Sequence, residues 1–339
     1  MNKLKDIFSP LQEELEKIIN VNELSYDINV PKKREYGDVT TNIALKASSI
    51  LNKSPNEIAN EIVKRINKQK LEIKKVEIAN PGFINFFFTE EYLIKVGELV
   101  IDSGIDIIKK KKDKYTIVYN IEKGKIKSKR IKSYVNVLSS IIRFTNKEVK
   151  VNMDDIKEDV NIYKNNELTD KINIEGFNIL KESKFMNDID ESLMNYLSIS
   201  KTYNTVVDID FDKVFLNHLS NGYYKLNYTL YRINNIISIF KDEDIEFDIK
   251  DIYYMNPFGK KMISYIMELK EILDESIKYY EPYKILNYID DICEEFIEFD
   301  STMFYRDIDK KELYVNLFTL TVLHRFIKEL LNLLGIYNK

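Results

Sequence analysis

The sequence predicts an α+β fold that is mainly helical, and three observations support this. Helical stripes alternate with two β-rich runs near the N-terminus, a strand–helix–strand pattern follows, and helical periodicity dominates the second half. The 339 residues are 44% hydrophobic and 31% charged, which is enough to bury the cores of about two or three domains. Only nine Gly and six Pro argue against a loop-rich β protein.

Segment 1–107 is predicted to form a compact α/β module. Ser9 and Ser54 are each followed by Pro and then, at the third position, by Gln or Glu, which is the pattern of a helix capping box. Two β-rich runs, 75–79 and 83–88, are joined by the turn sequence Asn-Pro-Gly. The expected helices start after Ser9 and Ser54, cover 39–50, and run from Thr89 to about Asp102.

Segment 108–205 is predicted to contain one βαβ unit, with strands at 115–119 and 148–151, a basic loop at 123–130 and a helix at 134–144. It has no G-x-G-x-x-G or P-loop pattern, so the sequence identifies no phosphate cradle. Residues 156–205 are rich in Asn, Asp and Lys and weakly periodic. We expect them to form a connector with short helices.

Segment 206–339 is predicted to be a helical bundle. Leu226, Leu230 and Ile233 fall on one helical face, and Tyr224 and Tyr228 fall on the opposite face. The last expected helix, about 311–334, is apolar on two sides, as is typical of the central helix of a bundle.

The composition excludes several classes of protein. One Cys rules out a disulfide framework, and two His with one Cys leave almost nothing for a zinc site, so we expect no metal and no cofactor. No stretch reaches the roughly 18 apolar residues of a membrane span, and the N-terminus has no apolar signal core. We therefore expect a soluble, cytoplasmic protein that does not bind membranes.

The net charge of −4 hides a strong asymmetry. Residues 109–132 contain eleven Lys and Arg against two acids, a net charge of +9, whereas residues 241–312 contain twenty acids and ten bases, a net charge of −10. A basic segment of this density is either a footprint for a polyanion or a solvated linker.

Three blocks near the N-terminus occur in a recognisable order and spacing. They are EYGDVTTNIA at 35–44, KSPNEIA at 53–59 and VEIANPGFINF at 76–86, and they closely resemble the N-terminal additional domain of arginyl-tRNA synthetases. The end of the chain resembles the DALR-like, helical anticodon-binding domain of the same family. The matching pieces there are DIDFD at 208–212, YTLYRI at 228–233 and LLGI at 333–336.

The middle of the chain departs from that family. Where the family carries its H-I-G-H type signature, this sequence has KGKIKSKR at 123–130, without a His, and the K-M-S-K-S type loop is missing. Adenylate formation needs preorganised donors around the ATP phosphates. The resemblance thus implies a degenerate paralogue, a pseudoenzyme with no catalytic residues, that keeps a reduced catalytic-domain remnant at 108–205 and binds tRNA of the arginine type.

Two regions are candidates for phosphate and base contacts. In the basic loop, Lys123, Lys125, Lys127, Lys129 and Arg130 are expected to meet tRNA phosphates, unless the loop is only solvated surface.

In the helical bundle, Tyr224 and Tyr228 are expected to stack on unpaired anticodon bases, unless they are packing residues. Arg232 either reaches a phosphate or pins the domain.

A third candidate surface is the run 83–88, in which Phe83, Asn85 and Phe87 share one face of a strand. The resemblance implies that this module touches the outer corner of tRNA, where an Asn between two aromatic rings would read a base. The alternative is a hydrophobic sheet face under the helices.

Other functions remain open alongside non-catalytic tRNA binding. The acidic bundle fits a protein-interaction role, such as a regulator of a genuine synthetase. A residual enzyme acting on nucleotides, or an ATP-dependent arginine–tRNA ligase as the resemblance would name it, is the remaining alternative.

Overall fold

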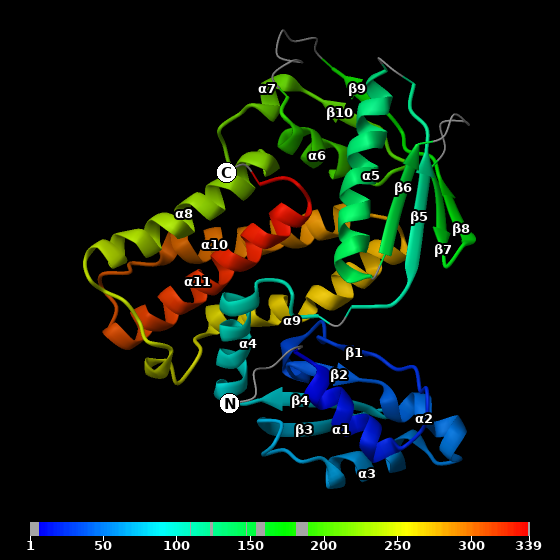
Figure 1. Ribbon diagram of the computed structural model, residues 1–339. Coiled ribbons are helices and arrows are strands. Elements are labelled where there is room, and N and C mark those ends of the chain that lie inside the picture. The colour runs from blue at the N-terminus through cyan, green and yellow to red at the C-terminus, as the bar shows by residue number, and fades with distance from the viewer. Residues whose placement is uncertain are drawn as a thin grey trace. The chain divides into compact units, whose positions relative to one another are not determined.

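The computed structural model describes residues 7–108, 110–122, 125–146, 148–153, 160–180 and 189–337 (Figure 1). It is a mixed α+β fold that is mainly helical, which confirms the predicted fold class. Two compact units make up the fold. The first contains Met1–Ile108, Glu246–Leu269 and Tyr305–Val322, and the second contains Lys109–Ile245, Lys270–Phe304 and Leu323–Lys339.

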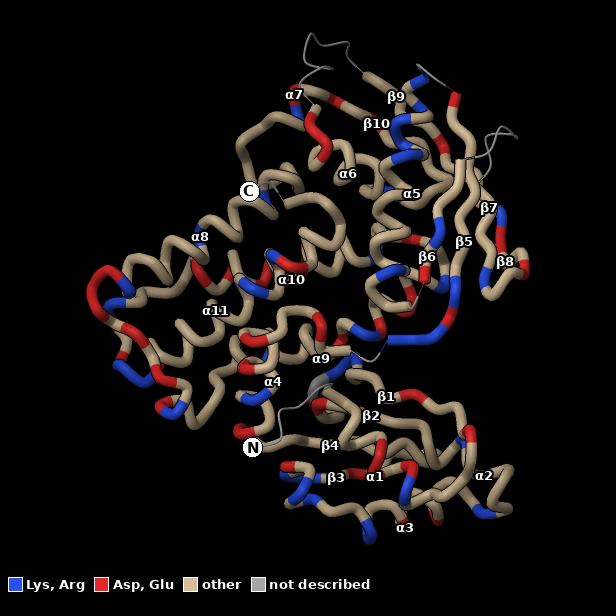
Figure 2. The backbone as a smooth tube through the Cα atoms, in the orientation of Figure 1, with Lys and Arg blue, Asp and Glu red and all other residues tan. Residues whose placement is uncertain are grey.

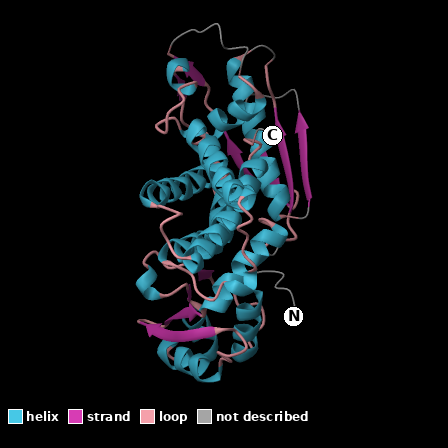
Figure 3. Ribbon diagram, turned by 90° about the vertical axis from the view of Figure 1, so that its left-hand side faces the viewer, coloured by secondary structure: helices cyan, strands magenta, loops and turns pink. Residues whose placement is uncertain are grey.

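The first unit contains a four-stranded antiparallel sheet with strand order β1-β2-β4-β3. The two predicted β-rich runs form the β3–β4 hairpin, and Ile84 and Phe86 of β4 are fully buried. Helices lie against this sheet (Figure 3). The elements are α1 (Ser9–Ile19), β1 (Ile28–Asn29), η1 (Arg34–Tyr36), β2 (Val39–Thr41), α2 (Ile43–Leu51), α3 (Pro55–Arg65), β3 (Ile73–Ala79) and β4 (Phe83–Phe88).

Only one of the two predicted capping boxes is present. Ser54 Oγ accepts a hydrogen bond from Glu57 N, and the Glu57 carboxylate accepts one from Ser54 N at 2.9 Å. Ser9 instead lies inside α1, and Phe8 occupies the N-cap without a side-chain bond, so that prediction is wrong. The helix expected over 39–50 begins only at Ile43, because the β-branched run Val-Thr-Thr pairs with β4 as strand β2.

Helix α4 (Glu90–Ser103) packs against those parts of α9 (Pro257–Lys278) and α11 (Lys310–Leu333) that belong to the first unit. The Glu90 carboxylate accepts hydrogen bonds from Met255 N and Lys260 Nζ. A Cβ atom at Gly97 would lie 2.6 Å from Cζ of Phe318 and 3.2 Å from Val322 Cγ2. The close approach of α4 to α11 therefore requires glycine at this position.

The second unit contains a second four-stranded sheet with strand order β6-β5-β7-β8. Strands β5 (Lys114–Tyr119) and β6 (Glu148–Met153) are parallel and joined by α5 (Ile126–Thr145), which confirms the predicted βαβ unit. The predicted loop at 123–130 differs from the structure, because α5 begins at Ile126 and includes most of it.

The connector with short helices expected at 156–205 is wrong in its first part, because residues 160–172 extend the sheet as strands. Strands β7 (Val160–Lys164) and β8 (Glu167–Ile172) form an antiparallel hairpin, and its turn residues Asn165 and Asn166 both have positive φ. Such a turn matches the twist of the strands that it joins, and Asn tolerates it well. The region also contains β9 (Phe177–Ile179), which pairs in parallel with β10 (Val207–Ile209), and helix α6 (Glu191–Ile199).

Arg130 joins three segments of the second unit. Its side chain is fully buried, and its guanidinium donates to the backbone carbonyls of residues 175, 176, 198, 202 and 205 at distances of 2.5 to 3.4 Å. Burial lowers the pKa of Arg130 to about 10, so the group remains charged at neutral pH. One side chain thus holds the loop before β9 and the loop between α6 and β10 against the start of α5.

The helices of the second unit agree with the predicted bundle. After α7 (Phe211–Val214), α8 (Gly222–Asp242) buries Leu226, Leu230 and Ile233 and contacts α10 (Tyr283–Thr302). The last helix extends to Leu333, near its predicted end. Asn195 Nδ2 of α6 donates to Gly335 O at 3.0 Å, and Ser192 Oγ donates to Ile336 O, which fastens the segment after α11 to α6.

We expect Gly97→Ala to lower the free energy of unfolding by about 1–3 kcal/mol, although Ala is the better helix former, because the added methyl group overpacks the contact with Phe318. Gly176→Ala is the matched control, since its Cβ would lie 3.5 Å from Lys127 Cβ, an ordinary contact. Urea denaturation of both variants measures the difference. Equal stability of the two variants would contradict the close packing of α4 on α11.

We expect Arg130→Met to lower the free energy of unfolding by about 2–5 kcal/mol, because several buried carbonyls lose their donor. Arg143→Met, which changes an exposed Arg on the same helix, should have little effect. Millimolar guanidinium should raise the melting temperature of Arg130→Ala and leave that of the wild type unchanged. If Arg130→Met and Arg143→Met have the same urea midpoint, Arg130 does not stabilise the second unit in this way.

Candidate nucleic-acid interface

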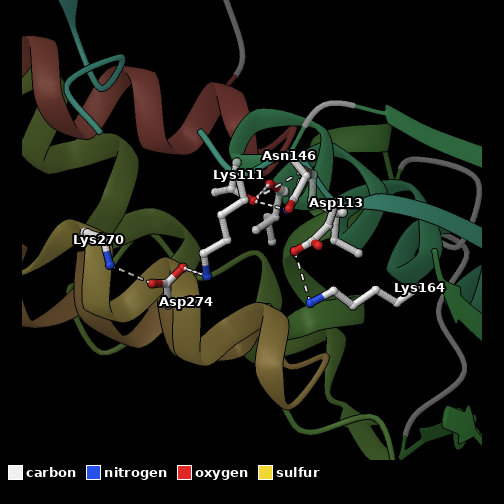
Figure 4. Close-up of polar contacts among 9 residues, drawn as sticks. Lys111, Asp113, Asn146, Lys164, Lys270 and Asp274 are labelled. Atoms are coloured by element: carbon white, nitrogen blue, oxygen red, sulfur yellow. Dashed lines mark hydrogen bonds and ion pairs between the residues drawn. The ribbon is translucent and has the colours of Figure 1, made fainter. Parts of the chain in front are cut away.

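The first half of the basic segment is partly neutralised within the second unit (Figure 4). Lys111 Nζ lies 2.7 Å from Asp274 Oδ1, and Lys270 lies 2.9 Å from the other oxygen of the same carboxylate. Lys164 binds Asp113 at 3.0 Å in the same way. The two nearby Lys lower the pKa of Asp274 despite its burial. These ion pairs indicate a structural role for part of the segment.

The second half of the segment carries three cations at the start of α5. Lys125, the N-cap residue, pairs with Glu122, Lys127 Nζ donates to Asn173 Oδ1 at 3.4 Å, and Lys129 is exposed. Lys123, which was also predicted to contact phosphates, lies outside the described residues. The N-terminus of a helix carries partial positive charge, so cations in this position disfavour the helix and favour a bound anion.

Arg130 does not occupy the exposed position that the predicted phosphate contact requires. Its guanidinium faces the interior and is taken up by backbone carbonyls. The pattern of alternating cations could not separate it from its neighbours, because burial here depends on loops that follow much later in the chain.

The predicted aromatic face lies on the side of β4 opposite the buried residues Ile84 and Phe86. Phe83 is 37% exposed, Phe87 is half-buried with Lys75 Nζ 5.0 Å above its ring, and Asn85 is only 5% exposed. Asn85 sits between β2 and β3, so it presents little surface to a base. The two rings, rather than the amide, form the accessible part of this face.

The tyrosines of α8 are partly exposed, and Arg232 is tied to α10. The rings of Tyr224 and Tyr228 stack with centroids 6.0 Å apart, and both are half-buried. Arg232 Nε lies 2.8 Å from Asp300 Oδ2, and its Nη2 lies 3.1 Å from Oδ1, which is a two-point ion pair. The geometry of Arg232 matches the alternative in which it pins the domain.

Lys225, which no sequence pattern singles out, makes a second link between α8 and α10. Its side chain is 10% exposed and lies 2.8 Å from Asp290 and 2.7 Å from Glu294. Burial alone would lower the pKa of Lys225, but the two carboxylates outweigh burial and raise it. With these cations turned toward α10, few charges remain along α8, and acidic residues gather in the loop that follows it (Figure 2).

Other kinds of site find no support among the described residues. These residues contain no group of three or more His, Cys, Asp or Glu that could hold a metal ion. No helix in the described ranges has both the length and the apolar composition needed to cross a bilayer. Cys293 is buried, and burial raises the pKa of its thiol to about 12, so it is not a reactive nucleophile.

The structural relatives share the fold of this chain. The arginyl-tRNA synthetase of Thermus thermophilus superimposes with a TM-score of 0.66 at 8% identity, over 99% of both chains. That of Plasmodium falciparum gives 0.63 at 11% identity, over 98% of this chain and 97% of the other.

The sequence relatives match over shorter stretches. The arginine–tRNA ligases of Oceanobacillus iheyensis and Thermotoga maritima are 35% and 39% identical over 111 and 93 residues, or 31% and 27% of this chain. These matches span only 20% and 15% of the two ligases. Residues 5–88 match the family model of the arginyl-tRNA synthetase N-terminal domain, and residues 226–338 match that of the DALR anticodon-binding domain. The chain therefore belongs to the arginyl-tRNA synthetase family, with those two domains on either side of a middle region that neither family model covers.

Proposed function

We propose that this protein binds tRNA of the arginine type without aminoacylating it. The observation that carries the proposal is the arrangement along the chain. An N-terminal synthetase domain and an anticodon-binding domain flank a middle region whose described residues form a four-stranded sheet and a two-stranded sheet. The chain thus has matches to both of these synthetase domains, while the middle region that would perform catalysis is short.

The start of α5 supports a contact with phosphates. Lys125, Lys127 and Lys129 lie at the positive end of the helix dipole, and no acid occupies its first turn. A helix selected only for stability favours acids there. A bound phosphate would be stabilised by these lysines and by the helix end together.

Two aromatic surfaces support contacts with bases. Phe83 and Phe87 on the open side of the first sheet, and Tyr224 and Tyr228 on α8, each offer ring surface at partly exposed positions. Aromatic side chains stack on unpaired bases without requiring a particular sequence.

The loss of catalysis follows from the segment between β5 and α5. In this interval the chain offers Lys and Gly but no His, and the two His of the protein, His218 and His324, lie elsewhere in the sequence. The edge of β5 that faces away from β6 is occupied by the antiparallel strand β7, which in turn pairs with β8. Adenylate formation depends on donors around the phosphates, and this region supplies few of them.

A second candidate function is docking of a basic protein partner, such as a synthetase. The observation that favours it is the net charge of −10 over residues 241–312, which repels phosphate. Binding assays with tRNA separate the two functions, because only the first requires affinity for tRNA.

We expect the triple variant Lys125→Ser, Lys127→Ser and Lys129→Ser to bind tRNA more weakly and with a flatter salt dependence. If all three lysines neutralise phosphates, their contribution to affinity falls about 40-fold between about 50 and 200 mM salt. Filter binding or fluorescence anisotropy with arginine tRNA at several salt concentrations measures both changes. The matched control replaces three exposed lysines elsewhere in the second unit, Lys201, Lys213 and Lys241, by Ser. If both triple variants show the wild-type slope, α5 is not the contact.

We also expect no arginine-dependent ATP–pyrophosphate exchange, with or without tRNA. Each tenfold loss of rate corresponds to about 1.4 kcal/mol of barrier, so the loss of several phosphate donors places the reaction below detection. An active arginine–tRNA ligase in the same assay is the positive control. Exchange above the enzyme-free background would overturn the non-catalytic part of the proposal and leave tRNA binding intact.

A further inference from the structure

Within the part of the chain that the structure describes, the four-stranded sheet of the second unit has one covered face and one open face. On the covered face, Ile117 and Ile162 are fully buried, and α5 packs against β5 and β6 on this side. The strand register places alternate residues on the opposite face, where Thr116 is paired with Lys150 and Tyr163. Figures 1 and 3 show the helices of this region on one side of the sheet.

None of the side chains on the open face is buried, which is unusual next to a parallel strand pair. Parallel strands are generally covered on both faces. The main residues of the open face, all half-buried or exposed, are Lys114, Thr116, Lys150, Asn152, Tyr163 and Lys171.

The open face carries an excess of positive charge. Lys114 and Lys150 both lie 3.4 Å from Glu148, so one carboxylate serves two ammonium groups. Lys171 has no ion pair with any residue that the structure describes. Three cations against one acid attract an anion with an extended backbone.

The same face also offers groups that suit unpaired bases. Tyr163 on β7 lies between β5, which carries Lys114, and β8, which carries Lys171. Asn152 on the edge strand β6 is exposed. Asn161 is opposite Val118 and Lys171, but its Oδ1 is buried, so Asn152 is the amide that a base can reach. A sheet face with an aromatic ring, an exposed amide group and flanking lysines is an arrangement that stacks bases and holds the adjoining phosphates.

We propose that the open face of the β6-β5-β7-β8 sheet binds single-stranded RNA. Unpaired nucleotides fit better than a duplex, because a duplex buries the base faces that Tyr163 would stack on. This site belongs to neither matched domain, since residues 114–171 lie between them. It does not depend on the proposed binding of folded tRNA, and it gives the middle region a role other than catalysis.

The test measures binding of the full chain to a fluorescent single-stranded ten-nucleotide RNA and, in parallel, to the same sequence as a duplex. We expect the single strand to bind more tightly. Lys150→Ser with Lys171→Ser should reduce the salt dependence, removing about a 7-fold change in affinity between about 50 and 200 mM salt. Lys201→Ser with Lys241→Ser is the control of equal charge, and it should keep the wild-type slope.

The aromatic contribution is tested with two changes at Tyr163. Tyr163→Leu should weaken binding of the single strand by about 5- to 150-fold, whereas Tyr163→Phe, which keeps the ring, should bind like the wild type. Thermal melts of all variants verify that they fold. The inference is overturned by a wild type that does not bind the single strand at low salt, by an unchanged slope in the Lys150 and Lys171 variant, or by a Tyr163→Leu variant that is folded and binds normally.

The oligonucleotide assay also separates this inference from the proposed function. Normal tRNA binding combined with no binding of the ten-nucleotide strand rejects the sheet site and leaves the proposed function standing. Binding of the strand that responds to these variants, with no affinity for tRNA, supports the sheet site and rejects the proposed function.

Discussion

The buried guanidinium of Arg130 is the constraint on which the middle of this protein depends. A charge removed from water is costly unless hydrogen bonds surround it, and here five backbone carbonyls do so. Because neighbouring residues of a helix are about 100° apart, turning Arg130 inward sends Lys129 outward to solvent. The same interaction that closes the loops around β9 and β10 therefore fixes where the basic end of α5 faces.

Sequence patterns predicted the elements whose signals are local. The β3–β4 hairpin, the capping box at Ser54 and the βαβ unit each depend on residues close together in the chain, and all three are present. The β7–β8 hairpin was missed although Asn165-Asn166 is itself a turn signal. Only β7 has an apolar alternation, with Val160 and Ile162, whereas β8 is exposed along most of its length and has no clear apolar pattern. Ser9 failed as a cap because the residue before it already has helical geometry.

The residue types of the candidate site could be predicted from the sequence, but the groups that these side chains bind could not. The cations of α5 and the aromatic residues of β4 and α8 are at the expected positions, but Arg130, Asn85 and Arg232 are buried or paired. Their partners come from distant segments, as when Arg232 binds Asp300 across 68 residues of sequence. Periodicity assigns a residue to a face of an element, and only the tertiary fold decides what covers that face.

Because the charges of α8 and α5 are paired to different extents, these two helices offer different kinds of contact to RNA. On α8, Lys225 and Arg232 are paired with α10. The half-buried tyrosines of α8 therefore offer mainly ring surface to RNA, and stacking depends little on salt. At α5, Lys125 and Lys129 are exposed and Lys127 is half-buried near the helix N-terminus, and contacts of lysines with phosphates weaken steeply as salt rises. The acidic residues around α8 oppose phosphates at a distance, and salt screens this repulsion. Rising salt should therefore move the balance of RNA binding from the α5 region toward the aromatic face of α8.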